Sequence, residues 1–220
     1  MIFTAKLKQP GENVLSLQGK AGQLEAVLTV PEQIKTNYVA FLGHPHSLQG
    51  GTMNNKVVTT MARAFKELGI PALRFNFRGV GLSAGVYNDG IGESEDMLEL
   101  VKQWQQEQKT AQIIFAGFSF GSYVAYRTAA QSKHVLLVTI APPVHHYDYT
   151  EFKPEPRPWL IVQGDADEVV PCSLVLDFAD SSTPSLPVIE FAETGHFFHG
   201  KLLELKARLK EYVNTKVLSL

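Results

Sequence analysis

The residues best suited to do chemistry lie within residues 113–122, which read IIFAGFSFGS. An apolar strand here runs into the pattern G-x-S-x-G, and a helix rich in small residues is predicted to follow. A turn of this kind is sharp and strained, so that the hydroxyl of Ser119 projects above the sheet. Gly117 and Gly121 stand two residues before and after it, where strand and helix nearly touch. This context predicts that Ser119 is a nucleophile rather than part of an ordinary turn.

A serine nucleophile needs a base, and the base needs an acid that orients it. The acid is predicted on the loop after an apolar strand at residues 159–162. Asp165 and Asp167 both qualify by chemistry. Asp167 is favoured because it takes the place of the acid in the pattern G-x-x-D-x-V-V-P, whereas Asp165 is expected to be a turn residue that bonds its own backbone. Glu168 is expected to be solvated.

The base is predicted to be His196, on the loop between a last strand at residues 187–191 and a last helix. This completes the chain order serine, acid, histidine. His199 is the rival, and only one of the two can point at Ser119. The remaining histidines lie upstream of the acid and would break this order: His44, His46, His134, His145 and His146. They lack partners at metal-ligand spacing, so no metal site is predicted.

Two backbone N–H groups are expected to bind the oxyanion of the reaction. One belongs to Phe120, the residue after the nucleophile. The other is expected from the loop that follows an earlier apolar strand, where Pro45 has no N–H to donate. His46 is therefore the first choice and Ser47 the second. The glycines at positions 50–51 either bring backbone close to bound substrate or only shape the turn.

Four motifs together resemble a known family: HPHSLQGGTMNNKVV at 44–58, RFNFRGVGLS at 74–83, GFSFG at 117–121 and GHFFHG at 195–200. The chain is similar to the small, lidless, mostly bacterial serine hydrolases of the α/β-hydrolase superfamily. That group is similar to dienelactone hydrolases, which carry cysteine at the nucleophile position. In this superfamily the R-G-x-G-x-S stretch is usually structural, which argues against a phosphate-binding loop at residues 78–85.

The resemblance implies an α/β-hydrolase fold of three layers, with a mostly parallel twisted sheet and helices on both faces. The alternation of apolar strands with amphipathic helices agrees, and one domain over residues 1–220 is predicted. Strands are predicted at 2–7 and 24–30, as an antiparallel opening, and at 38–43, 72–77, 113–118, 135–140, 159–162 and 187–191. Helices are predicted at 53–68, 95–106 with Ser94 as N-cap, and 201–213.

Only a short segment, from residue 141 to about 155, separates the strand at 135–140 from the next strand, and a helical lid does not fit there. This segment is expected either to overhang the cleft or to be an exposed polar loop; its aromatic members are His145, His146, Tyr147 and Tyr149. Four phenylalanines flank the expected catalytic residues, and at least two of them should belong to the core: Phe118, Phe120, Phe197 and Phe198.

A net charge of −2 argues against nucleic acid or an anionic membrane as the main partner. No stretch approaches the ~18 apolar residues needed to span a bilayer, and the first residues lack a signal-peptide pattern. The single cysteine, Cys172, excludes an internal disulfide and fits a reducing cytoplasm. It is expected to be a packing residue. A cytoplasmic protein is therefore predicted.

These observations predict a serine hydrolase that cleaves a small carboxylic ester, thioester or activated amide. Ser119 is expected to attack, His196 to carry the proton and Asp167 to orient the imidazole. No cofactor is implied, and the expected partner is a small-molecule acyl substrate. Two alternatives remain: a catalytically idle hydrolase-fold protein used for binding or scaffolding, and an enzyme that transfers the acyl group to an acceptor other than water.

Overall fold

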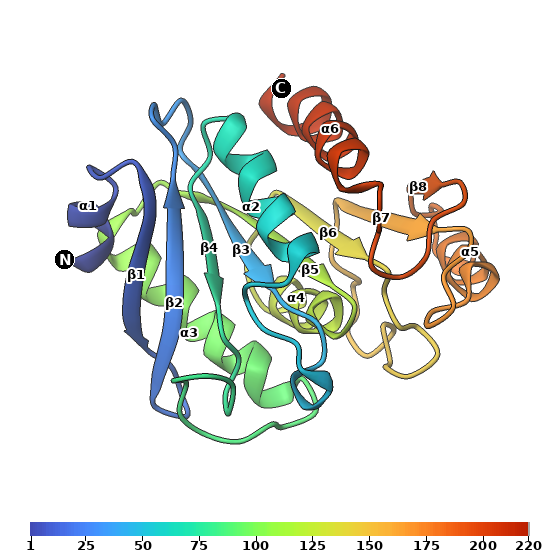
Figure 1. Cartoon of the computed structure of the whole chain (residues 1–220), viewed down its shortest axis with the longest axis horizontal. Helices are drawn as coiled ribbons and strands as arrows, with labels where there is room; N and C mark the ends of the chain where they lie inside the picture. The colour runs from blue at the N-terminus through green and yellow to red at the C-terminus, as the bar shows by residue number, and fades with distance from the viewer. Residues whose placement is uncertain (220) are drawn as a thin grey trace.

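The computed structural model describes residues 1–219, which are built around one twisted sheet (Figure 1). The strands of the described residues are β1 (Gly11–Gln18), β2 (Gln23–Val30), β3 (Tyr38–Gly43), β4 (Ala72–Phe75), β5 (Gln112–Phe118), β6 (Leu136–Ile140), β7 (Trp159–Gly164) and β8 (Val188–Phe191). The helices are α1 (Ile2–Lys6), η1 (Ser47–Gln49), α2 (Lys56–Glu67), α3 (Ile91–Glu107), α4 (Phe120–Ala130), α5 (Cys172–Ser181), α6 (Leu202–Val213) and the π-helical turn η2 (Asn214–Leu218).

The strands are ordered β1-β2-β4-β3-β5-β6-β7-β8 across the sheet. Strand β2 is antiparallel to both β1 and β4, and every later pairing is parallel. The central strands are buried on both faces, which explains their continuous apolar sequences. Because parallel strands end at the same edge, the segments after β3, β4, β5, β6, β7 and β8 all begin there.

Helices cover both faces of the sheet and complete three layers (Figure 1). On one face, α2 and α6 pack over the sheet through residues such as Phe65 and Leu209. On the other face, α3, α4 and α5 pack through residues such as Trp104, Tyr126 and Val175. The arrangement confirms the predicted three-layer α/β-hydrolase fold.

The prediction of a strand at residues 2–7 is wrong, because this segment forms the short helix α1. The backbone N–H groups of Ile2 and Thr4 donate to the carboxylate of Glu107, at 2.7 and 2.9 Å. Phe3 is buried against Trp104, with ring centroids 4.7 Å apart. The antiparallel partner of β2 is instead β1, whose buried residues alternate with exposed ones as a strand at the sheet edge requires.

Helix α3 begins earlier than predicted, and Ser94 lies inside it rather than at its N-cap. Gly90 is the N-cap residue, and the buried carboxylate of Glu93 accepts hydrogen bonds from the backbone N–H groups of Gly90 and Asn88, both at 2.9 Å. The carboxylate of Glu93 thus satisfies two backbone donors at the start of the helix. Helix α2 begins later than predicted, after Asn55, whose side chain accepts from the N–H of Val57. Helix α5 was not predicted.

Residues 141–158, all described by the structure, form turns and bends between β6 and β7. They contain no helical lid, as the sequence predicted. Among residues 1–219, no helix combines the length and the apolar character needed to cross a membrane.

The start of α4 lies in direct contact with β3 and β5. Gly43 and Gly117 pair across these two strands. A β-carbon on Gly117 would lie 2.0 Å from the carbonyl oxygen of Gly121, and one on Gly121 would lie 2.4 Å from the carbonyl carbon of Gly43. Real β-carbons do not approach backbone so closely, so any side chain here would push the helix away from the sheet.

Gly117→Ala should therefore destabilise the protein by about 3 kcal/mol, because backbone rather than a flexible side chain must move. Gly50→Ala is the matched control: its β-carbon meets nothing within 4 Å, and its φ of +77° is the only obstacle. That control should cost about 1 kcal/mol. Urea unfolding measures both values, and equal costs would show that close packing does not restrict position 117.

Candidate active site

Ser119 occupies the turn between β5 and α4 in a strained backbone conformation. Its φ is +54° and its ψ is −125°, outside the regions that residues other than glycine favour. Its N–H donates to the carbonyl of Ile140 at 2.8 Å, which ties the turn to the end of β6. Strain of this kind persists only where the surroundings enforce it, and it is concentrated at functional sites.

The side chains of Ser119, His196 and Asp167 form a hydrogen-bonded chain. The Nε2 atom of His196 lies 3.0 Å from the Oγ atom of Ser119. Its Nδ1 atom lies 2.9 Å from Oδ2 and 3.1 Å from Oδ1 of Asp167. An ionised carboxylate only accepts, so Nδ1 carries the proton and Nε2 is free to accept the serine proton. The structure therefore brings together the three residues that the sequence singled out.

Asp167 is buried and its carboxylate has several donors. Oδ1 accepts from the backbone N–H groups of Val169 and Val170, at 2.9 and 2.7 Å, and Oδ2 accepts from Nε2 of Gln163 at 3.2 Å. Burial by itself raises the pKa of Asp167, but the hydrogen bonds from His196, Val170 and Val169 outweigh it and lower the pKa below its usual value. Asp167 is thus held as an anion.

Asp165, the rival acid, is exposed and does not contact the imidazole. Its Oδ1 accepts from the backbone N–H of Thr194 at 3.3 Å, so it bonds a neighbouring loop rather than the backbone of its own turn. Glu168 is exposed as expected, yet its Oε2 lies 3.4 Å from the backbone nitrogen of His196. His199, the rival base, is exposed beside Phe197, and the imidazole that bonds Ser119 is that of His196.

A small cavity opens beside Ser119 and His196. It has a volume of about 130 Å³ and is lined by Pro45, His46, Gln49, Gly50, Gly51, Asn55, Ser119, Val169, His196 and Phe197. Of the four flanking phenylalanines, Phe197 reaches this cavity and is 42% exposed. Phe118, Phe120 and Phe198 are buried, so the expectation that at least two belong to the core is confirmed.

The loop after β3 folds tightly at the wall of this cavity. The carbonyl of His46 accepts from the N–H groups of Gln49 and Gly51, at 3.1 and 3.0 Å. A β-carbon on Gly51 would lie 2.1 Å from the carbonyl oxygen of Pro45, and Gly50 needs its positive φ. Both glycines therefore shape the turn and also line the cavity. Within residues 1–219, the N–H groups of His46 and Phe120 donate to no backbone carbonyl.

His44 begins the same loop and is fully buried. Its Nδ1 lies 2.7 Å from the carbonyl oxygen of Pro45, and its Nε2 accepts from the N–H of Phe77 at 2.9 Å. These two bonds require a neutral ring whose proton sits on Nδ1. Burial lowers the pKa of His44 to about 4, and the bond to Pro45 offsets only part of this effect. The ring therefore joins the loop after β3 to the end of β4.

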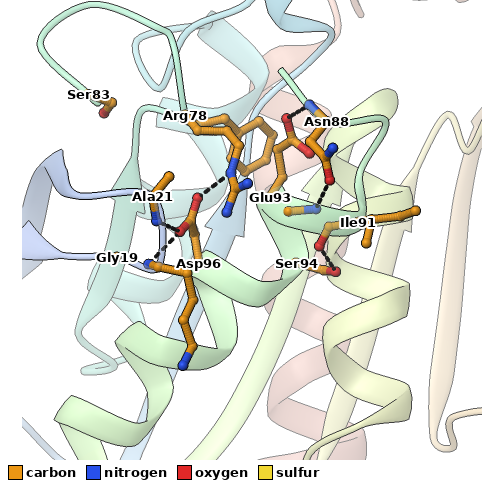
Figure 2. Close-up of polar contacts among 12 residues, drawn as sticks. Gly19, Ala21, Arg78, Ser83, Asn88, Ile91, Glu93, Ser94 and Asp96 are labelled. Atoms are coloured by element: carbon orange, nitrogen blue, oxygen red, sulfur yellow. Dashed lines mark hydrogen bonds and ion pairs between the residues drawn. The ribbon is translucent and has the colours of Figure 1, made fainter. Parts of the chain in front are cut away.

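The glycine-rich loop at 78–85 has a structural role. Figure 2 shows Arg78 and Asp96 pointing toward each other, and Asp96 accepts from Nε of Arg78 at 2.7 Å. The same buried carboxylate accepts from the backbone N–H groups of Lys20 and Ala21. Ser83 donates to the carbonyl of Asn76 at 2.7 Å. Arg78 thus attaches the loop to Asp96 of α3, and the same carboxylate attaches α3 to the β1–β2 turn.

The tyrosines of the segment after β6 pack against α4 and do not line the cavity. Tyr149 is buried, and its hydroxyl lies 2.7 Å from Oγ of Ser122. Tyr147 is half-buried against Phe120 and Tyr123. The exposed His145 and His146 are not among the residues that line the cavity. Within residues 1–219, no group of His, Cys, Asp and Glu is arranged to hold a metal ion.

Two residues that support the site were not singled out by sequence reasoning. Gln163 supports the acid from the end of β7, and the only available signal was an amide in an otherwise apolar strand. His44 supports the loop of His46, and its signal was the pair of histidines on either side of Pro45.

Cys172, expected to be a packing residue, is half-buried at the start of α5.

Comparison with known proteins places the chain in a family. No protein-family model matches the chain. An uncharacterized protein of Rickettsia prowazekii is 35% identical over 187 residues, which cover 80% of this chain and 79% of that protein. An α/β serine hydrolase homologue from Coxiella burnetii is 41% identical, with a TM-score of 0.88, over 92% of this chain and 98% of its own.

A lidless α/β serine hydrolase from Xanthomonas campestris is 39% identical, with a TM-score of 0.89, over 93% of this chain and 94% of its own. The chain belongs to the α/β-hydrolase superfamily, and it shares the lidless architecture of these serine hydrolases.

The burial of His44 predicts a pH-dependent loss of stability. The pKa of His44 in the folded protein, about 4, lies below the ordinary value of 6.5. The buried neutral ring therefore contributes fully to the free energy of unfolding above pH 6.5, and this contribution is lost as the pH falls toward 4. The loss should reach about 3 kcal/mol. His44→Gln should reduce the fall in the free energy of unfolding over this range by a similar amount.

Urea unfolding at a series of pH values measures this difference. The exposed residue His199 supplies the control, and His199→Gln should keep the pH dependence of the parent protein. If His44→Gln also kept the pH dependence of the parent protein, the buried ring would not be neutral as described.

Proposed function

We propose that this protein is a serine hydrolase that cleaves a small carboxylic ester, a thioester or a related activated acyl compound. The observation that carries the proposal is the hydrogen-bonded chain from the strained Ser119 through His196 to the buried Asp167. A strained serine within reach of a base that is itself oriented by an acid is the arrangement used for nucleophilic catalysis.

In the proposed reaction, Oγ of Ser119 attacks the acyl carbon while Nε2 of His196 takes its proton. Asp167 holds the imidazole in the required tautomer and stabilises the imidazolium that forms. The backbone N–H groups of Phe120 and His46 donate to the oxyanion of the tetrahedral intermediate. His196 then gives its proton to the leaving group, and an acyl-enzyme remains on Ser119.

Water completes the cycle by the same steps in the second half-reaction. His196 removes a proton from water, which attacks the acyl-enzyme, and the proton returns to Oγ of Ser119 as the acid leaves. This chemistry needs no cofactor. Transfer to another acceptor would differ only in the molecule that replaces water.

The dimensions of the cavity support a short acyl group. Its volume of about 130 Å³ is well below the ~300–1,000 Å³ that is typical of sites for drug-sized ligands. Val169 and Phe197 provide its exposed apolar surface, and the turns at 141–158 add no lid above it. A long chain would therefore remain largely in water.

A fluorophosphonate probe tests the nucleophile directly. It should add one adduct per chain to the intact protein, and Ser119→Ala should abolish both the adduct and ester hydrolysis. The loss of turnover should be on the order of 10⁴–10⁶-fold. Mass spectrometry of the labelled peptide locates the adduct.

His199→Ala is a suitable control, because His199 is exposed near the site without contacting Ser119, and it should label like the parent protein. A folded protein that stays unlabelled at high probe concentration would contradict the proposal and favour a binding or scaffolding role.

A series of p-nitrophenyl esters tests the proposed acyl length. Efficiency, measured as kcat/KM, should peak between acetyl and about butyryl, because each further CH₂ gains at most about 0.8 kcal/mol and only if it is buried. A steady rise in kcat/KM to long acyl chains would reveal a deeper pocket than the cavity described and overturn the short-acyl assignment.

A further inference from the structure

The two residues assigned to the oxyanion are joined through their side chains. The rings of His46 and Phe120 pack together, with centroids 5.1 Å apart. Tyr87, from the loop between β4 and α3, lies over both, at 5.0 Å from His46 and 5.5 Å from Phe120. Tyr147 contacts Phe120 from the segment after β6, at 5.6 Å. Three loops of the carboxyl edge and the start of α4 therefore meet in one aromatic cluster.

The hydrogen bonds within this cluster have a defined direction. The backbone N–H of Leu48 donates to Nδ1 of His46 at 3.2 Å, so Nδ1 carries no proton. The neutral ring must then carry its proton on Nε2, which donates to the Tyr87 hydroxyl at 3.2 Å. The Tyr87 hydroxyl then keeps its own proton for another partner, and the hydroxyl of Tyr147 lies 3.4 Å away.

The ionisation of these groups is consistent with that direction. Burial lowers the pKa of His46, although the charges of Asp89 and Glu93 act against it. Burial is also the main cause that raises the pKa of Tyr87, with the hydrogen bond to Tyr147 adding to it, so the phenol stays protonated. A neutral imidazole and a neutral phenol are the forms that the hydrogen-bond pattern requires.

Tyr87 is itself held by a rigid neighbourhood. The next residue, Asn88, donates its backbone N–H to the fully buried carboxylate of Glu93 at 2.9 Å (Figure 2). The side-chain oxygen of Asn88 accepts from the N–H of Gly92 at 3.0 Å. The loop that carries Tyr87 is thus bonded twice to the first turn of α3, which follows the N-cap residue Gly90. Because its loop is bonded in this way, the hydroxyl of Tyr87 can fix the position of the loop that carries His46.

We infer that Tyr87 is a positioning residue of the oxyanion hole: its hydroxyl holds the His46 ring, and the ring holds the turn that presents the His46 N–H. The inference rests on the function proposed above. Its physical basis is that the Leu48 N–H, the His46 ring and the Tyr87 hydroxyl form one continuous chain. A donor held in place before the reaction stabilises an oxyanion without a cost of reorganisation at the moment of attack.

Tyr87→Phe tests the inference, because it keeps the ring that packs on His46 and Phe120 and removes only the hydroxyl. With p-nitrophenyl acetate, kcat should fall about tenfold or more while KM changes little. The inhibition constant of a trifluoromethyl ketone, whose serine adduct carries an oxyanion, should rise by a similar factor.

Tyr123→Phe is the matched control. Tyr123 stacks on Tyr147 in the same cluster, at 4.6 Å, but its hydroxyl bonds Glu151 and Arg127 rather than His46. This variant should leave kcat and the inhibition constant unchanged. Unchanged values in Tyr87→Phe, equal changes in both variants, or a change in KM alone would each overturn the inference.

Amide hydrogen exchange provides a readout that does not depend on turnover. The N–H groups of Leu48 and Gly51 should exchange faster in Tyr87→Phe than in the parent protein or in Tyr123→Phe, because the turn loses its support. A parent protein that neither hydrolyses esters nor binds the ketone would defeat the proposed function, while the exchange rates would still decide the role of Tyr87.

Should Tyr87→Phe fail to fold, Tyr147→Phe takes its place, since it removes a hydroxyl that lies within hydrogen-bond distance of the Tyr87 hydroxyl. A smaller fall in kcat with unchanged KM and faster exchange at Gly51 is then the expected result. Parent-like kcat and exchange in that variant would overturn the inference.

Discussion

The turn from β5 into α4 is the constraint on which the rest of this structure depends. Ser119 is the one residue between the end of β5 and the start of α4. It must therefore adopt a positive φ, and its hydroxyl must stand above the sheet edge. The turn fits only because Gly117, Gly121 and Gly43 lack side chains where the helix meets β3 and β5. Phe120 begins α4, so its N–H has no acceptor within the helix.

Three histidines at this edge have different roles because their hydrogen-bond partners and burial differ. His44 is sealed in the core and bonded at both ring nitrogens, so it stays neutral and connects two loops. His46 is half-buried and bonded to a turn and to Tyr87. His196 faces a carboxylate on one side and a serine hydroxyl on the other. Of these three rings, only that of His196 has a nitrogen free to accept a proton beside the hydroxyl of Ser119, which is why the proposed chemistry is assigned to it.

The fold class and the residues of the hydrogen-bonded chain could be predicted because their signals are local. Ser119 lies in a five-residue pattern, and His196 follows the last strand in an order that the topology dictates. Other features depend on contacts between distant segments. The first residues are helical because Phe3 packs on α3, and α3 begins early because the buried carboxylate of Glu93 caps it. The hydroxyl of Tyr87 reaches His46 from 41 positions away, and nothing in the residues near either of them indicates that contact.

The most direct test of this account is the stoichiometry and position of acylation by a p-nitrophenyl carbamate, whose carbamoyl-enzyme is slow to hydrolyse. We expect one equivalent of p-nitrophenol per chain, one carbamoyl group on the peptide that contains Ser119, and loss of both in His196→Ala. Release without any carbamoyl group on Ser119, or a carbamoyl group on Cys172 instead, would contradict the claim that the strained turn presents an activated serine.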